Sequence, residues 1–276
     1  MKTHHSVRSA VAATFFAALA GCGGPPPIDA QGQALAETAA QVAVGLEGPC
    51  TSASFFTGID LSRGADAAAI RTAADVINGV FAGCIHAVPD AAPATGITVG
   101  FGDKGCGIPF TPLQFAGSLG VHFGAPGTNI LVLRFAALRL LDLAIDGELD
   151  LASGRDSFSW TMSDLRVSAP HVDVLLHARG TLRAAKFHTA VVFDGDGFIG
   201  DGEQSTSFVA RGLLRDLRDC YPSEGTLAAT IAPALLPPAT LTLRFNSDTS
   251  GGGKVKLDWD GHDREWYLPS RGCMKR

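Results

Sequence analysis

The 276-residue sequence is poor in charged side chains, which make up 18% of it against about a quarter in typical soluble proteins. Acidic residues outnumber basic ones by 27 to 22. This balance gives the chain no electrostatic reason to bind nucleic acid or anionic lipid head groups. Apolar residues reach 46%, so the composition predicts a folded chain with a sizeable core.

The sequence also lacks the motifs of common catalytic and metal centres. It has no Cys-x-x-Cys pair, no Cys/His spacing typical of zinc, and no Gly-x-Ser-x-Gly. No stretch after the N-terminal segment approaches 18 consecutive apolar residues, so no transmembrane helix is predicted. We therefore expect no catalytic residues and no enzyme activity.

The N-terminus has the order of an export signal. Lys2 and Arg8 precede an apolar run over 10–20, which is too short to span a membrane as a mature helix. The run leads into Leu19-Ala20-Gly21-Cys22, which resembles the lipobox of bacterial lipoproteins, where the chain is cut before the Cys and the Cys is acylated. The resemblance implies a signal peptide over 1–21 and a lipid anchor, including palmitate, on Cys22.

A Gly/Pro tether over 22–32 would follow the lipid. The processed chain would keep 20 basic against 27 acidic residues, a net charge of −7. Gly23 stands where the enterobacterial form of this family carries an Asp that retains the protein at the inner membrane, so the resemblance implies the outer membrane of the cell envelope. The alternative is a secreted protein with an ordinary signal and an unmodified Cys22.

The cysteines beyond Cys22 predict disulfides. They are five, an odd number, so at least one thiol stays unpaired or pairs with another molecule. Export would place them where disulfides persist. We expect Cys220 to pair with Cys273, because they bracket the last hairpin, and Cys84 to pair with Cys106.

The first part of the body has helical periodicity. The first helix is predicted over 33–46, because apolar residues recur there every three to four positions: Leu35, Ala39, Val42 and Leu46. A loop is predicted over 47–58. A second helix is predicted over 65–81, with Ser62 or Asp66 as its cap.

From about residue 97 the apolar period changes to two, which predicts strands. The stretch 141–151 is predicted to be one strand with Gly147 as a bend or bulge, because a turn at Asp146-Gly147 would mix apolar and charged side chains on one face. The clearest alternating segments are SFSWTMS (157–163), HVDVLLH (171–177), TLTLRFN (240–246) and KVKLDWD (254–260), and the last two predict a hairpin joined by SDTSGGG.

The predicted fold class is therefore mainly β. A helical N-terminal segment over 33–90 precedes an antiparallel meander over 91–276, which forms a sandwich or a curled sheet. This layout resembles that of β-rich surface lipoproteins of Gram-negative bacteria, whose strand–turn segments often carry an FG…GC turn, here Phe101, Gly102, Gly105 and Cys106. The resemblance covers about the last two thirds of the chain and implies no activity.

Two sequence patterns resemble ligand-binding motifs. In both cases the neighbouring residues argue against a ligand site. Residues 100–105 spell Gly-x-Gly-x-x-Gly, but the prolines in CGIPFTP leave no helix N-terminus for a phosphate, so a glycine-rich hairpin turn is predicted. His171, Asp173 and His177 could share a strand face, yet the two histidines would lie about 20 Å apart. A solvated polar face is the favoured interpretation.

The acidic stretch FDGDGFIGDGE (193–203) partly matches a calcium loop. Asp194, Asp196 and Glu203 take positions 3, 5 and 12 of an EF-hand, but Val192 stands at position 1, and both flanks are strand-like. A weak calcium site is one interpretation, and the acidic tip of a hairpin is the favoured one.

The function expected from the sequence is that of a lipid-anchored envelope lipoprotein with a structural or binding role, held to the membrane by its lipid. One alternative is a carrier that holds a lipid or other apolar ligand in a curved sheet, suggested by the one-sided apolar strands. Another is a hydrolase acting on envelope polymers, which would require a cluster of carboxylates or histidines on one rim of the sheet.

Overall fold

The structure is a computed structural model. The residues that it describes do not include Cys22, Glu203, Cys220 or Cys273, so the predictions made for them lie outside the described residues. The described ranges are 27–54, 66–80, 83–91, 95–107, 114–125, 127–140, 143–154, 157–169, 172–185, 190–200, 206–216, 219, 221–231 and 239–268.

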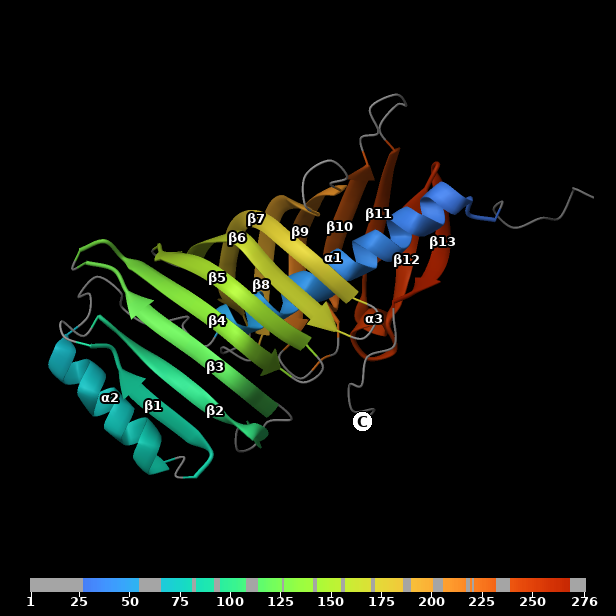
Figure 1. Ribbon diagram of the computed structural model, residues 1–276. Helices are drawn as coiled ribbons and strands as arrows, with labels where there is room; N and C mark the ends of the chain where they lie inside the picture. Colours follow the sequence, from blue (N-terminus) through green and yellow to red (C-terminus); the bar gives the residue numbers. More distant parts are fainter. Residues whose placement is uncertain are drawn as a thin grey trace, which may run out of the picture.

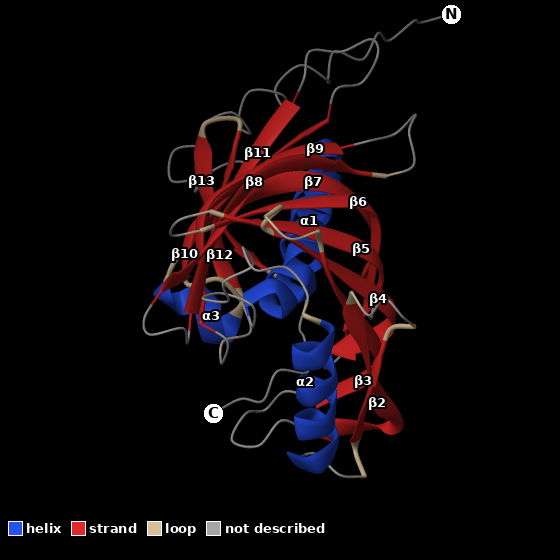
Figure 2. Ribbon diagram, turned by 90° about the vertical axis from the view of Figure 1, so that its left-hand side faces the viewer, coloured by secondary structure: helices blue, strands red, loops and turns tan. Residues whose placement is uncertain are grey.

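The strands of the described chain form a single thirteen-stranded sheet, in which strand order follows the sequence and every neighbouring pair is antiparallel. The sheet curls along its length (Figures 1 and 2), so the predicted antiparallel meander is confirmed. The strands are β1 (Ile85–Pro89), β2 (Gly96–Gly107), β3 (Gln114–Phe123), β4 (Ile130–Leu140), β5 (Leu143–Ser153), β6 (Phe158–Ala169), β7 (Val172–Ala185), β8 (Ala190–Ile199), β9 (Thr206–Asp216), β10 (Glu224–Ile231), β11 (Ala239–Phe245), β12 (Lys254–Trp259) and β13 (His262–Tyr267).

Strands form where apolar and polar residues alternate, because every second side chain then faces the core. The prediction of one strand at 143–151 is confirmed: Gly147 has a φ of 118°, and the register with β6 shifts between Asp146 and Glu148. The predicted inward positions of the other segments are buried: Phe158, Trp160, Met162, Val174, Leu176, Leu241, Leu243, Phe245, Val255, Leu257 and Trp259.

Helix α1 (Ala30–Ser54) lies along the concave face of the sheet, against β5 to β11 (Figure 2). Asp29 caps its start, since the Asp29 Oδ1 atom accepts a hydrogen bond from the Gly32 N–H at 2.7 Å. Within the described ranges no helix combines the length and the hydropathy needed to cross a membrane. The apolar face predicted from the sequence is confirmed, because Leu35, Ala39, Val42 and Leu46 are all fully buried.

The helix does not end at residue 46. It continues to Ser54, so the predicted loop is wrong over 47–54. Pro49 lies inside this last part, where a proline costs a backbone hydrogen bond and about 3 kcal/mol. Pro49 and Ala53 are nevertheless buried against the core, so tertiary packing outweighs the local turn signal.

Helix α2 (Ala67–Val80) packs on the other end of the sheet, against β1 and β2 (Figures 1 and 2). Of the two predicted caps, Asp66 is the one observed, because its Oδ1 atom accepts from the Ala68 N–H at 2.8 Å. The Asn78 side chain bonds both backbone groups of Ala87, donating to the oxygen at 2.8 Å and accepting from the N–H at 2.7 Å. The helix thereby satisfies backbone hydrogen-bonding groups of the edge strand β1. This strand lies before residue 91, which was the predicted start of the meander.

The disulfide Cys84–Cys106 joins the start of β1 to the end of β2, as the sequence predicts, with 5.4 Å between the Cα atoms. The Gly102 N–H also bonds the Cys84 carbonyl at 3.1 Å. Residues 100–105 therefore lie inside β2, where the register with β3 shifts between Phe101 and Cys106. The predicted hairpin turn is wrong, because the glycines form an irregularity within a long strand.

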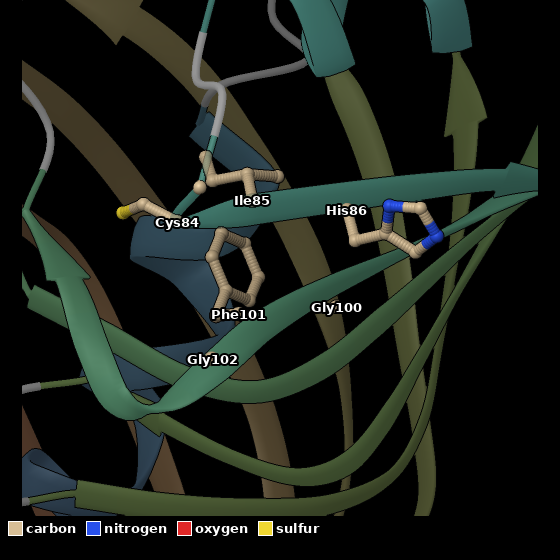
Figure 3. A pocket seen from close by; sticks show the side chains of 7 residues that line it. Cys84, Ile85, His86, Gly100, Phe101 and Gly102 are labelled. Atoms are coloured by element: carbon tan, nitrogen blue, oxygen red, sulfur yellow. The ribbon is translucent and has the colours of Figure 1, made fainter.

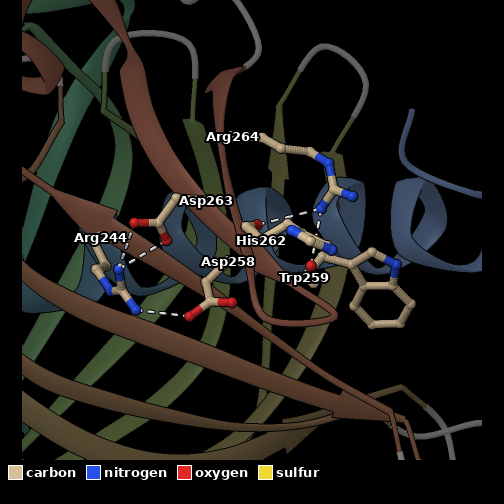
Figure 4. Close-up of polar contacts among 6 residues, drawn as sticks. All are labelled: Arg244, Asp258, Trp259, His262, Asp263 and Arg264. Atoms are coloured by element: carbon tan, nitrogen blue, oxygen red, sulfur yellow. Dashed lines mark hydrogen bonds and ion pairs between the residues drawn. The ribbon is translucent and has the colours of Figure 1, made fainter. Parts of the chain in front are cut away.

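At the opposite end, the predicted hairpin of β11 and β12 is confirmed, with the short helix α3 (Ser247–Gly252) in its connection. Arg244 on β11 bridges two carboxylates, bonding Asp258 at 2.7 Å and Asp263 at 2.9 Å (Figure 4). The Arg264 guanidinium donates to the Trp259 carbonyl at 2.9 Å. Charged side chains on β13 leave this last strand exposed to water. Such charges protect the free sheet edge from pairing with another chain.

Candidate binding groove on the outer face

The acidic stretch begins as a strand. β8 takes in residues 193–199 and pairs with β7 on one side and β9 on the other. The predicted hairpin tip is therefore wrong for this part, while residues 201–205 lie outside the described ones. Six residues separate the ends of β8 and β9, so only the later part of the stretch falls in the hairpin connection.

The glycines of β8 are closely packed: an indole ring lies over Gly195, and a Cβ atom on Gly197 would lie 2.7 Å from the Ala178 Cα atom. Trp160 on β6 is buried, and Gly180 and Gly195 face each other across β7 and β8 beside it. A Cβ atom on Gly180 would lie 2.6 Å from Trp160 Cζ2, and one on Gly195 would lie 2.5 Å from it. The Asp-Gly-Asp-Gly pattern thus reflects close packing on the inner face, where the sequence suggested turn chemistry.

The two aspartates of β8 point to the outer face, which we define as the face of the sheet turned away from α1. Asp194 Oδ1 accepts from the Gly212 N–H at 2.7 Å, at the point where the register with β9 shifts. Asp196 Oδ2 lies 3.6 Å from Arg179 Nε. Both carboxylates therefore have protein partners, and calcium binding at Asp194, Asp196 and Glu203 stays a prediction.

Two side-chain pairs stand next to each other on the outer face of β7 and β8. His177 is the register partner of Phe198, and their rings stack with centroids 4.6 Å apart at 18°. Arg179 is the register partner of Asp196, two residues along each strand. Successive side chains on one face of a strand are about 6.6 Å apart, so an aromatic pair and an ion pair lie side by side.

A bulge in β6 brings further polar groups to His177. The register with β7 shifts between Met162 and Leu165, and Asp164 has a φ of 56°. Asp164 Oδ1 then lies 3.4 Å from His177 Nε2. Of the three residues predicted to share a face, His177 finds this partner, Asp173 binds Arg166 instead at 2.6 Å, and His171 lies outside the described residues.

These residues line a hollow of about 400 Å³, which we call the outer groove. Phe198 is 40% exposed in it, a large value for a ring in a strand. Sequence reasoning found His177 and Asp196 but missed Phe198 and Arg179. The available signal was the position of Phe198, which lies two residues after Asp196 in β8 and so faces the same side of the strand as the aspartates. The lining consists of Thr161, Met162, Ser163, His177, Ala178, Arg179, Asp196, Gly197 and Phe198.

A second hollow, of about 370 Å³, lies at the start of the sheet. Figure 3 shows the Phe101 ring beside Cys84, with His86 further along β1. The Phe101 ring stacks on Phe115 at 5.2 Å, so its packing serves the sheet. Apart from His86, the lining offers only backbone groups for polar recognition, and the outer groove is the richer site.

Carboxylates also gather on the outer face of β5. Burial raises the pKa of Asp150 above its ordinary value, the neighbouring Glu148 raises it further, and Arg134 opposes both. Arg134 binds Glu148 at 2.8 Å. On β7 the hydrogen bond from Arg166 lowers the pKa of Asp173. Asp150 therefore lies beside a second carboxylate, Glu148, which is paired with Arg134.

The described part of the chain contains no group of three His, Cys, Asp or Glu residues close enough to hold a metal ion. In comparisons with known proteins, no family model, no curated protein and no solved structure matches the chain.

Proposed function

We propose that the chain is a lipid-anchored protein of the cell envelope, held at the outer membrane by a lipid on Cys22, with a binding or structural role and no catalysis. The lipobox-like Leu19-Ala20-Gly21-Cys22 carries the proposal. The fold adds one supporting feature. α1 begins at Ala30, and its residues from Ala39 to Leu46 are almost all buried inside the curled sheet.

The distance from the anchor to the body is therefore short. Seven residues lie between Cys22 and Ala30, and the eight steps from one Cα atom to the next span at most roughly 26–29 Å. The segment after Cys22 would therefore connect the lipid directly to α1, the helix at the centre of the fold. Such an attachment suits a protein that works close to the membrane surface.

Acylation tests the proposal. Cells expressing the full chain are labelled with radioactive palmitate, and the protein is expected to carry the label. The Cys22→Ser variant should carry none, while a Cys84→Ser variant, which loses a thiol in the body, should be labelled as strongly as the parent. Label on the Cys22→Ser protein would refute the lipid site.

Membrane placement has its own test. If Gly23 leaves the protein free to reach the outer membrane, fractionation should recover it there. Gly23→Asp should shift it toward the inner membrane, and Gly23→Ser should not. Equal distribution of all three proteins would contradict the outer-membrane assignment without touching acylation.

A carrier of an apolar ligand is the alternative that the curled sheet invites. In the structure α1 occupies the concave face over β5 to β11 and shares one hydrophobic cluster with those strands. A ligand on that face would have to displace the helix. Hydrogen exchange of α1, compared with and without lipid micelles, measures whether the helix leaves.

A further inference from the structure

We propose that the outer groove binds a neutral saccharide, such as a stretch of an envelope glycan. The inference goes beyond the anchor. It concerns the face of the sheet opposite α1, and it rests on the side chains of β6, β7 and β8.

The Phe198 ring forms an exposed aromatic platform in the outer groove. Phe198 is 40% exposed, on a face whose other strand positions are mostly polar. One side of its ring is covered by the stacked His177, which holds the ring in one orientation. A fixed ring with an accessible face suits the apolar C–H face of a pyranose, since such contacts need area and orientation.

A pair of charged side chains lies beside this ring. Arg179 and Asp196 offer donors and acceptors one row away from the ring. Their 3.6 Å separation is longer than a good hydrogen bond, so both groups keep bonding capacity. Sugar hydroxyls both donate and accept, and a vicinal pair of them can bridge a guanidinium and a carboxylate. Thr161 and Ser163 add hydroxyls on the β6 side of the groove.

Charge argues for a neutral ligand. The lining holds one guanidinium and one carboxylate, and Asp164 adds a second carboxylate against His177. An anionic ligand would meet these carboxylates, and a cationic one would meet Arg179. The hollow of about 400 Å³ falls in the range of small-molecule sites, which is room for a short oligosaccharide.

Titration of the full-length protein tests the inference. The protein is kept in a detergent without a sugar head group, and its acylation is measured on the same sample, so the anchor and the groove can fail separately. The probes are neutral trisaccharides of glucose, α- and β-linked, and of N-acetylglucosamine. We expect millimolar binding of at least one by calorimetry.

Variants assign the binding to the groove. Phe198→Ser should weaken binding by about tenfold or more, because the platform is lost. Val209→Ser removes another outer-face apolar side chain, 37% exposed and outside the lining, and should leave binding unchanged. Arg179→Gln should weaken binding several-fold, and Arg183→Gln, on the same strand and face, should not. Circular dichroism checks that each variant is folded.

Several results would overturn the inference. The first is that no probe binds. The second is that Phe198→Ser and Arg179→Gln both bind the probes as well as the parent protein does. The third is that inorganic phosphate or glucuronate binds as strongly as the neutral sugars. Self-association of the protein that is lost in Phe198→Ser would assign the same face to a second copy of the chain instead.

Discussion

Two regions of the sheet, β5 to β11 and β1 to β2, are covered by helices in different ways. α1 lies in the concave face and is buried on most of its sides from Ala39 to Leu46, so the sheet from β5 to β11 wraps around it. α2 lies against β1 and β2 and leaves half of its surface in water. The same sheet is thus stabilised by an enclosed helix over β5 to β11 and by a surface helix with a disulfide at its first two strands.

This difference has a physical origin in side-chain size. α1 is rich in alanine and has Gly45 facing β7, where a Cβ atom would lie 2.9 Å from Val174 Cγ2. Small residues allow a close approach of helix and curled sheet, which encloses the helix. α2 has its apolar residues on one stripe, with Ile70 and Ala74 buried and Val76 exposed, as expected for a surface helix.

The largest expected effect comes from truncating the enclosed helix. Leu46→Ala removes a fully buried side chain and should lower the free energy of unfolding by about 2–5 kcal/mol. Ile77→Ala in α2 removes a partly buried one and should cost roughly 1–2 kcal/mol. Urea denaturation measures both. Equal losses would erase the contrast between the two helices.

The disulfide is expected to matter for the α2 end alone. It closes a 22-residue separation, and replacing both cysteines by serine should lower the free energy of local unfolding at this end of the sheet by about 3 kcal/mol in the loop-entropy account. Hydrogen exchange of the Cys84→Ser/Cys106→Ser protein should quicken in β1, β2 and α2. Faster exchange in α1 as well would show that the two ends unfold as one unit.

A matched pair of glycines tests the fit of each helix. Gly45→Leu would overpack the contact with Val174 and Leu176 and should cost about 1–3 kcal/mol. Gly79→Leu in α2 meets nothing within 4 Å and should gain up to about 0.5–1 kcal/mol from helix propensity. The melting temperatures of the two variants should therefore move in opposite directions, and a shared direction would contradict the packing described for α1.

The smallest effect concerns pH. Because the folded pKa of Asp150 is raised, the folded state holds its proton more tightly, so stability falls as the pH rises above about 3.8 through the raised value. Asp150→Asn should then slightly raise the melting temperature at neutral pH and lose this advantage near pH 4. Asp146→Asn, on the same strand, serves as the control. A lower melting temperature of the Asp150→Asn protein at neutral pH would reverse the sign.

Much of the fold was predictable because its signals are local. Alternation in KVKLDWD located β12, and the register argument at Gly147 located a bulge. The failures came from tertiary contacts that outweigh local signals. The stretch 47–58 suggested a loop, and packing against the sheet kept Pro49 inside α1. Asp-Gly-Asp-Gly suggested a turn, whereas the Trp160 ring over Gly195 and the close approach of Ala178 to Gly197 explain those glycines inside β8.

The outer groove was half visible in the sequence. His177 and Asp196 stood out as titratable residues, whereas their register partners could not be known before β7 was aligned with β8. The one signal in the sequence was that Phe198 falls on the same side of its strand as the two aspartates. The enclosure of α1 was not predictable, since helical periodicity shows which residues are apolar and says nothing about how far a sheet curls around them.

The claim that α1 is a permanent part of the core is tested most directly by hydrogen exchange of the full-length protein, followed with and without lipid micelles. The account predicts that amides from Ala39 to Leu46 exchange as slowly as those of β7, opening only with global unfolding, and that micelles leave them unchanged. Exchange in α1 that is orders of magnitude faster than in β7, or that quickens when lipid is added, would contradict the account and make α1 a displaceable cover over an apolar site.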